Sequence, residues 1–318
     1  MKSRRPAGWP ARATIVEVGL RDGLQAERLT LPTETKLELA KRLLAAGLRH
    51  LEVTSFVSPR AVPQLADAAE LLAALPRRPG VTFSALVPNA KGAERAIAAR
   101  VDAMVVFLSA SESHNRKNLN RPIEQSLADV AEVRSIAEAA GIPVHAAISV
   151  CFGCPFEGEV PLSQVLRIAE ELAMLGIDRL SIADTTGMAT PPMVRERVEA
   201  LRARLPGVRL ALHFHNTRGL GLCNVMAGLD CGIDRFESAI GGMGGCPFAP
   251  GATGNICTED LVFLLEECGV ETGVDLGALI EAAKAAEAAV GHPLPGQVMK
   301  AGPRLRLHPL EAVRTAAG

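Results

Sequence analysis

Short apolar runs alternate with longer amphipathic segments along the chain. The segment 33–46 is of the second kind, because Leu37, Ala40, Leu43 and Leu44 recur in it at helical spacing. Strands of a parallel sheet are covered on both faces, which makes them short and apolar, and helices form the crossovers between them. The pattern predicts eight strand-and-helix units, with strands at 14–18, 50–54, 82–87, 103–108, 144–150, 179–183, 210–215 and 235–238.

One further amphipathic helix is predicted at 275–290, after the eighth unit. No shift of composition divides the chain, so we expect one α/β catalytic domain, a TIM (β/α)8 barrel over 13–273. Residues 1–12 are expected to form a flexible tail and 274–318 a helical extension packed on the barrel. A doubly wound open sheet with a small appendage is the alternative.

Composition narrows the class of protein. Hydrophobic residues make up 48% and charged residues 22% of the 318, which is typical of a globular protein with a large core. The net charge of -1 gives no basic surface for nucleic acid or an anionic membrane, so neither partner is expected. Seven cysteines and no apolar leader favour a cytoplasmic protein. The chain has no tyrosine, which leaves His, Asp, Glu, Cys and Lys as candidate acids and bases.

A metal site is indicated by His213-Phe214-His215 on the seventh predicted strand. Alternate side chains of a strand face the same way, so the two imidazoles can share one ion. Two packed imidazoles without a metal are the alternative. Asp22 follows the first strand and Asn255 lies in the uncharged, glycine-rich stretch after the eighth. In a closed barrel strands 7, 8 and 1 are neighbours, so these four side chains converge, whereas in an open sheet they need not meet.

Two imidazoles, one carboxylate and one amide oxygen leave two positions of an octahedral ion open. This donor set suits Mg²⁺ or Mn²⁺, with Zn²⁺ a less favoured third. Glu52 on the second strand and Asp184 after the sixth flank the same arc, although Glu52 could instead pair with Arg21 and Asp184 could cap the next helix. Cys246 lies amid the glycines and is either a reactive thiol in a lid or an incidental small hydrophobe.

Four segments, 18–25, 54–59, 213–215 and 244–255, resemble motifs of the hydroxymethylglutaryl-CoA lyases, and the likeness runs from about residue 14 to 273. That family consists of metal-dependent TIM barrels related to isopropylmalate synthases and ketoacid aldolases. The resemblance implies divalent-metal-dependent cleavage of 3-hydroxy-3-methylglutaryl-CoA into acetyl-CoA and acetoacetate. It thereby places the chain in leucine degradation and ketone-body metabolism, with an acyl-CoA as its partner.

The resemblance also implies roles for individual residues. Arg21 would face the thioester oxygen, Asp22 or His213 would act as the base, and Cys246 or His213 would return a proton. The implied metal ligands are Asp22, His213, His215 and Asn255. The supporting acids and pocket positions are Glu52, Asp184, Gln25, Ser55 and Ser181.

The chain departs from the family after His215, where Asp-Thr-Tyr-Gly is replaced by 216–219, Asn-Thr-Arg-Gly. We hypothesise that Arg218 contacts a substrate carboxylate or a CoA phosphate. The predicted loop 111–121, with Arg116 and Lys117, is assigned to the CoA phosphates. Two other functions stay open: a Claisen condensing enzyme or aldolase on the same metal site, and a catalytically silent acyl-CoA sensor. A homodimer or higher homo-oligomer is expected.

Overall fold

The strands close into a parallel barrel. The computed structural model describes residues 5–245 and 254–307, and within them the strand order is β1 to β8 with β8 paired to β1. The predicted TIM barrel is therefore confirmed and the open sheet is excluded. The strands are β1 (Thr14–Glu17), β2 (His50–Ser55), β3 (Thr82–Leu86), β4 (Ala103–Ser109), β5 (Val144–Ser149), β6 (Arg179–Asp184), β7 (Arg209–Phe214) and β8 (Arg235–Ser238).

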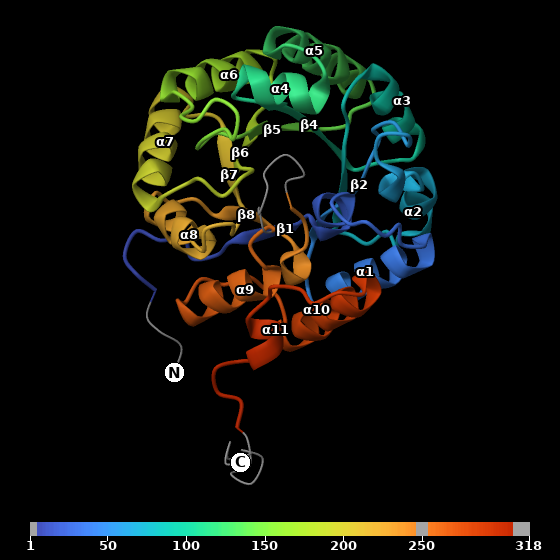
Figure 1. Cartoon of the computed structure of the whole chain (residues 1–318), viewed down its shortest axis with the longest axis vertical. Helices are drawn as coiled ribbons and strands as arrows, with labels where there is room; N and C mark the ends of the chain where they lie inside the picture. Colours follow the sequence, from blue (N-terminus) through green and yellow to red (C-terminus); the bar gives the residue numbers. More distant parts are fainter. Residues whose placement is uncertain (1–4, 246–253, 308–318) are drawn as a thin grey trace.

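Helices surround this barrel and connect its strands, as the ring in Figure 1 shows. The predicted loop 111–121 is mainly a helix, because Ser111 accepts the backbone N–H of His114 and caps it. No helix of the described residues is long and apolar enough to cross a membrane. The helices are α1 (Thr33–Ala45), α2 (Ala68–Ala74), α3 (Ala90–Ala98), α4 (Glu112–Leu119), α5 (Ile123–Ala139), α6 (Leu162–Met174), α7 (Pro191–Arg204), α8 (Gly221–Asp230), α9 (Thr258–Glu267), α10 (Leu276–Val290) and α11 (Val298–Ala301).

Segments before and after the eight strand-and-helix units pack on the barrel, whereas 303–307 at the end of the described chain are exposed. Trp9 belongs to the segment expected as a flexible tail, yet it is buried and its indole N–H donates to Asp230 at 2.8 Å. The predicted helix after the eighth unit is present as α10, which contacts α1 and α9, while α11 contacts α9 and α10 (Figure 1). The chain outside the barrel proper therefore covers the helices near β1 and β8.

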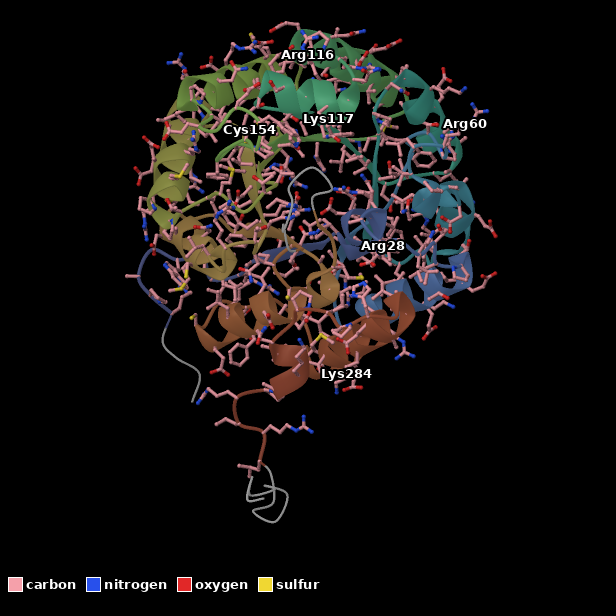
Figure 2. The ribbon with its side chains drawn as sticks, in the orientation of Figure 1. Arg28, Arg60, Arg116, Lys117, Cys154 and Lys284 are labelled. Carbon is pink, nitrogen blue, oxygen red and sulfur yellow. The ribbon has the colours of Figure 1, made fainter. Side chains whose placement is uncertain are left out.

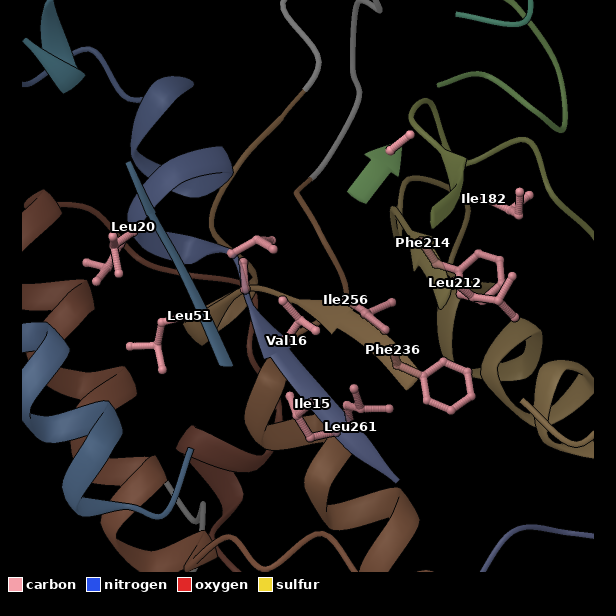
Figure 3. Close-up of a cluster of buried hydrophobic side chains, with 14 of the residues drawn as sticks. Ile15, Val16, Leu20, Leu51, Ile182, Leu212, Phe214, Phe236, Ile256 and Leu261 are labelled. Carbon is pink, nitrogen blue, oxygen red and sulfur yellow. The ribbon is translucent and has the colours of Figure 1, made fainter. Parts of the chain in front are cut away.

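Most of the core lies between the outer face of the sheet and the helices. Leu212, Phe214 and Phe236 are fully buried in this layer, and Figure 3 shows them beside one another on β7 and β8. Side chains alternate along a strand, so the polar residues that adjoin these three in the sequence face the inside of the barrel. Gly228 of α8 lies so close that a Cβ there would be 2.5 Å from Leu212 Cδ1 and 3.3 Å from Phe236 Cε1. The outer layer thus holds β7 and β8 rigidly, and with them the side chains that point inward.

Gly228→Val is expected to lower the free energy of unfolding by about 2 kcal/mol, because the added atoms overpack a closed core. Urea denaturation measures this change. Gly207→Val is the matched control, since no atom lies within 4 Å of its Cβ position, and it should leave the unfolding midpoint nearly unchanged. Equal midpoints for the two variants would show that α8 does not pack as described.

Candidate metal centre and active site

A tight turn after β1 presents Arg21 and Asp22. The backbone N–H groups of Arg21, Asp22 and Gly23 all donate to the carbonyl of Val18, at 3.1, 2.7 and 3.3 Å, and the bond from Gly23 is the i→i+5 bond of a π-helical turn over 19–23. The glycine at position 19 has a steric reason, because a Cβ there would lie 2.5 Å from Glu17 Oε1. The segment that the sequence presented as a loop is therefore a defined helical turn.

Glu17 connects this turn to the end of β8. Its buried carboxylate accepts the backbone N–H groups of Gly19 and Ile240, at 2.8 and 2.9 Å, and the hydroxyl of Thr258. Burial raises the pKa of Glu17 to about 7, while these hydrogen bonds act in the opposite direction. One carboxylate therefore positions both the Arg21–Asp22 turn and the segment that leads toward Asn255.

The two histidines of β7 meet Asp22 at the end of the barrel. His213 Nε2 lies 3.1 Å from His215 Nε2, and His215 Nε2 lies 3.9 Å from Asp22 Oδ2. Potential ligand atoms of these three residues all lie within 4.8 Å of one another. Both histidines are buried. Although burial acts to raise it, the pKa of Asp22 is held well below its usual range by Arg21 and the two histidines, so this carboxylate is an anion.

Asn255 completes the cluster from the other side. Its Nδ2 donates to Asp22 Oδ2 at 2.7 Å and to the carbonyl of Met243 at 3.0 Å. Its Oδ1 is buried and has no hydrogen-bond partner among the described residues. A buried amide oxygen without a donor is costly unless a cation or a ligand satisfies it. The four predicted ligands therefore come together, and their donor set fits a divalent cation.

Arg21 lies beside this cluster and is held by two carboxylates. Its Nε pairs with Glu52 and its Nη1 donates to Asp22 at 2.7 Å, which leaves Nη2 without a partner among the described residues. Burial raises the pKa of Glu52, against the influence of Arg21. The alternative that Glu52 pairs with Arg21 is thus what the structure shows, and the pairing orients the guanidinium at the rim of the site.

The same residues line one end of a cavity of about 670 Å³. Its polar end includes Arg21, Asp22, His213 and His215, and Gly245 also lines it. Its apolar lining includes Leu86, Val87, Val106, Phe107 and Val130, and the polar residues Asn118, Arg121 and Asp129 line it as well. A cavity of this size with charged groups at one end suits a small acyl compound better than a macromolecule.

The pocket positions that the sequence suggested differ in their relation to this cavity, because Ser55, Ser181 and Asp184 are not among the residues that line it. Gln25 lines it, and its Oε1 is buried without a partner among the described residues. Ser55 and Ser181 are buried on β2 and β6. Asp184 accepts the N–H groups of Met188 and Ala189, so it caps the turn after β6. Burial raises the pKa of Asp184 to about 6.

Arg218 connects two loops at the rim. Its Nη1 donates to the carbonyls of Thr186 and Gly187, at 3.1 and 2.8 Å, so part of the guanidinium is used within the protein. Arg116 and Lys117 are exposed on α4, where Figure 2 labels them on the helix ring. Neither lines the cavity, although Asn118, Leu119 and Arg121 of the same segment do. Cys246 lies outside the described residues.

One acid at the site escaped the sequence analysis. Glu237 of β8 lines the cavity, and its Oε2 lies 2.9 Å from His213 Nδ1. Although burial alone would lower it, this hydrogen bond and charge raise the pKa of His213. The missed signal was strand alternation, because Glu237 faces inward on the strand next to that of His213.

The fold and the site together define a (β/α)8-barrel enzyme with a candidate divalent-metal centre at the carboxyl ends of its strands. The chain belongs to the HMGL-like family, whose model matches residues 12–285. It is 45% identical over 289 residues to a hydroxymethylglutaryl-CoA lyase of Bacillus subtilis, covering 91% of this chain and 97% of that one. A Pseudomonas aeruginosa 3-hydroxy-3-isohexenylglutaryl-CoA/hydroxymethylglutaryl-CoA lyase is 43% identical, covering 89% and 94%.

Solved structures of HMG-CoA lyases resemble this chain over a similar share of its length. The HMG-CoA lyase of Bacillus subtilis matches with a TM-score of 0.90 and 44% identity, covering 92% of this chain and 98% of that one. An HMG-CoA lyase of Acinetobacter baumannii, solved with coenzyme A and 3-methylmalate, matches with a TM-score of 0.90 and 42% identity, covering 94% and 98%. The resemblance of the four motifs to this family is therefore confirmed.

The stability of the protein is expected to depend on pH through another buried acid, Glu259. Glu259 Oε2 accepts the N–H of Gly241 at 3.0 Å, and burial raises the pKa of Glu259 to about 8. Because the folded pKa exceeds the ordinary 4.5, the contribution of Glu259 to stability is fully present below pH about 4.5 and is lost as the pH rises toward 8. Glu259→Gln stays neutral at every pH. Between pH 5 and 8 its free energy of unfolding should therefore fall less steeply than that of the wild type, and the two slopes should differ by about 1 kcal/mol per pH unit.

Chemical denaturation at several pH values measures these slopes. Glu70→Gln removes an exposed carboxylate on α2 and should keep the wild-type slope. Parallel stability curves for the wild type and Glu259→Gln would contradict the assignment.

Proposed function

We propose that this chain is a carbon–carbon lyase that cleaves 3-hydroxy-3-methylglutaryl-CoA, or a closely related 3-hydroxy-3-alkyl acyl-CoA, to acetyl-CoA and a 3-ketoacid such as acetoacetate. The observation that carries the proposal is the convergence of Asp22, His213, His215 and Asn255 at the cavity beside Arg21. The relatives named above as lyases of this substrate class support it, as does the related structure solved with coenzyme A.

Mg²⁺ or Mn²⁺ fits the proposed ligands better than Zn²⁺, because two of the donors are oxygen atoms of a carboxylate and an amide. Near the ligands, Asp22, Glu52 and Glu237 supply carboxylates against the guanidinium of Arg21. A divalent ion would balance this excess of acidic groups. When bound, it would supply Lewis-acid chemistry that makes a tertiary hydroxyl of the substrate easier to deprotonate.

The reaction begins with removal of the hydroxyl proton by the anionic carboxylate of Asp22, because both ring nitrogens of His213 are used, Nδ1 toward Glu237 and Nε2 as a proposed ligand. The electrons of the broken O–H bond form the carbonyl of the ketoacid. The adjacent carbon–carbon bond breaks, and its electron pair moves into the thioester as an enolate. Arg21 stabilises the enolate oxygen through Nη2, the guanidinium nitrogen that its two carboxylate partners leave available. A proton from Cys246 then returns to carbon and completes acetyl-CoA.

Other side chains hold the substrate or the site. Gln25 presents an unpaired amide oxygen at the cavity, and Ser55 and Ser181 fill pocket positions of the family. Asp184 fixes the turn after β6, and Arg116 and Lys117 serve the CoA phosphates from α4. Glu52 orients Arg21 and thus supports catalysis through that residue. The protein acts in the cytoplasm as a homodimer or higher homo-oligomer, in leucine degradation and ketone-body formation.

Purified protein should release acetyl-CoA from 3-hydroxy-3-methylglutaryl-CoA when Mn²⁺ or Mg²⁺ is present. A chelator should abolish the release. His213→Ala should lower kcat/KM about 1000-fold, because several kcal/mol of transition-state stabilisation are lost with the ion. A coupled assay for acetyl-CoA measures both effects.

His292→Ala is the control for this assay, since His292 is exposed, pairs with Glu27 and does not line the cavity. Cys246→Ala tests the proposed proton return. Release that ignores the chelator would contradict the metal mechanism. Absence of release from a panel of 3-hydroxyacyl-CoAs, together with condensation of acetyl-CoA with a ketoacid, would favour a condensing enzyme.

Arg218→Ala tests the proposed contact to a substrate carboxylate or a CoA phosphate. Loss of one charge-assisted hydrogen bond should raise KM about tenfold, with a smaller effect on kcat. Arg202→Ala is a matched control, because Arg202 also donates to a backbone carbonyl, that of Gly232, but lies exposed away from the cavity. Unchanged kinetic constants in Arg218→Ala for every accepted acyl-CoA would show that Arg218 only joins the two loops.

A further inference from the structure

Glu237 is a largely buried carboxylate of the site. It belongs neither to the family motifs nor to the proposed set of metal ligands, so it has no role yet. Its side chain is 15% exposed and that of His213 is 8% exposed, so water competes little for the hydrogen bond between them. We propose that Glu237 is a positioning residue that fixes the ring of His213 and keeps its Nε2 available as a ligand. The proposal rests on the metal centre proposed above, and it does not depend on which acyl group is cleaved.

The barrel itself brings the two side chains together. His213 and Glu237 are direct partners in the ladder between β7 and β8, and both side chains face inward. Parallel partners are separated by the strand spacing of about 4.8 Å, which a glutamate side chain can span. The distance of 2.9 Å between Glu237 Oε2 and His213 Nδ1 is that of a good hydrogen bond.

The carboxylate determines which nitrogen of His213 carries the proton. Neutral imidazole has one N–H, and an ionised carboxylate only accepts, so a bond to Glu237 keeps the proton on Nδ1. The lone pair of Nε2 then points to the place where the Nε2 of His215 lies only 3.1 Å away. The opposite tautomer would direct an N–H to that place and prevent His213 from acting as a ligand.

Glu237 acts through His213 and is not itself a ligand. The acidic and basic side chains that place ligand atoms within 4.8 Å of one another are Asp22, His213 and His215, whereas Glu237 is outside this group. A carboxylate on the second nitrogen of a ligating histidine orients the ring and increases its basicity, and loss of such a partner typically costs 10–100-fold in metal affinity. Glu237 also lies close enough to Arg21 to act on it electrostatically, so its charge is part of the same network.

Binding of Mn²⁺ to the purified metal-free protein tests the proposal without an activity assay. Electron paramagnetic resonance of free Mn²⁺ gives the Kd. Glu237→Gln keeps the shape and one acceptor oxygen but removes the charge, and it should raise the Kd about tenfold. Glu237→Ala removes the acceptor as well and should raise the Kd about 100-fold. Glu237→Asp keeps the charge and should bind Mn²⁺ more tightly than Glu237→Ala.

Glu281→Gln is the matched control, because it removes an exposed carboxylate of α10 and should bind Mn²⁺ as the wild type does. Thermal melting of each variant shows that it is folded, and the nearly isosteric Glu237→Gln decides the test if Glu237→Ala unfolds. A wild-type Kd in Glu237→Gln and in every folded Glu237 variant would overturn the proposal.

His213→Ala separates this proposal from the proposed metal centre. If the wild type binds Mn²⁺, His213→Ala does not, and the Glu237 variants bind normally, the positioning role is wrong and the centre stands. If the wild type binds no Mn²⁺, both fail. Heteronuclear NMR of the Mg²⁺-loaded wild type should show the proton of His213 on Nδ1, and a proton on Nε2 would also contradict the proposal.

Discussion

Closure of the barrel is the constraint on which the site depends. β1 pairs with β8 over all four of its residues, and Glu17 at the end of β1 binds backbone N–H groups on both sides of that seam. This pairing brings Asp22, from the first turn of the chain, against His213 and His215, which lie about 190 residues later. Without closure the candidate ligands of β7 and those after β1 would lie at opposite edges of a sheet.

The chemistry of the site follows from the burial of like charges. Asp22, Glu52 and Glu237 lie near one another, and burial works against the ionised form of each. Arg21 and His213 offset part of that cost through hydrogen bonds, and a divalent ion would offset more. The same low-dielectric surroundings would strengthen the proposed interaction of Arg21 with an enolate, so an arrangement whose burial costs free energy would favour the charge that develops during cleavage.

Individual residues show where prediction from sequence succeeded. The eight strands and α10 were predictable because short apolar runs and helical spacing are local properties of the chain. The ligand cluster was predictable because strand ends in a barrel share one rim. The segment 111–121 was predicted as a loop, since its basic residues hid the cap at Ser111 that begins α4. Glu237 was missed because strand alternation gives the face that its side chain takes but not its partner, His213 on the next strand.

By itself, the sequence determined the periodicity that makes this chain a barrel, the motifs that place it in its family and the identity of the candidate ligands. Only the tertiary structure decided the partners of these side chains. It pairs Arg21 with Glu52 and Glu237 with His213, and it uses Asp184 to cap the turn after β6. It also leaves Asn255 Oδ1 buried without a hydrogen-bond partner among the described residues. The reason is physical. A local pattern fixes which face a side chain takes, but its partner depends on the register between strands and on the packing that holds it.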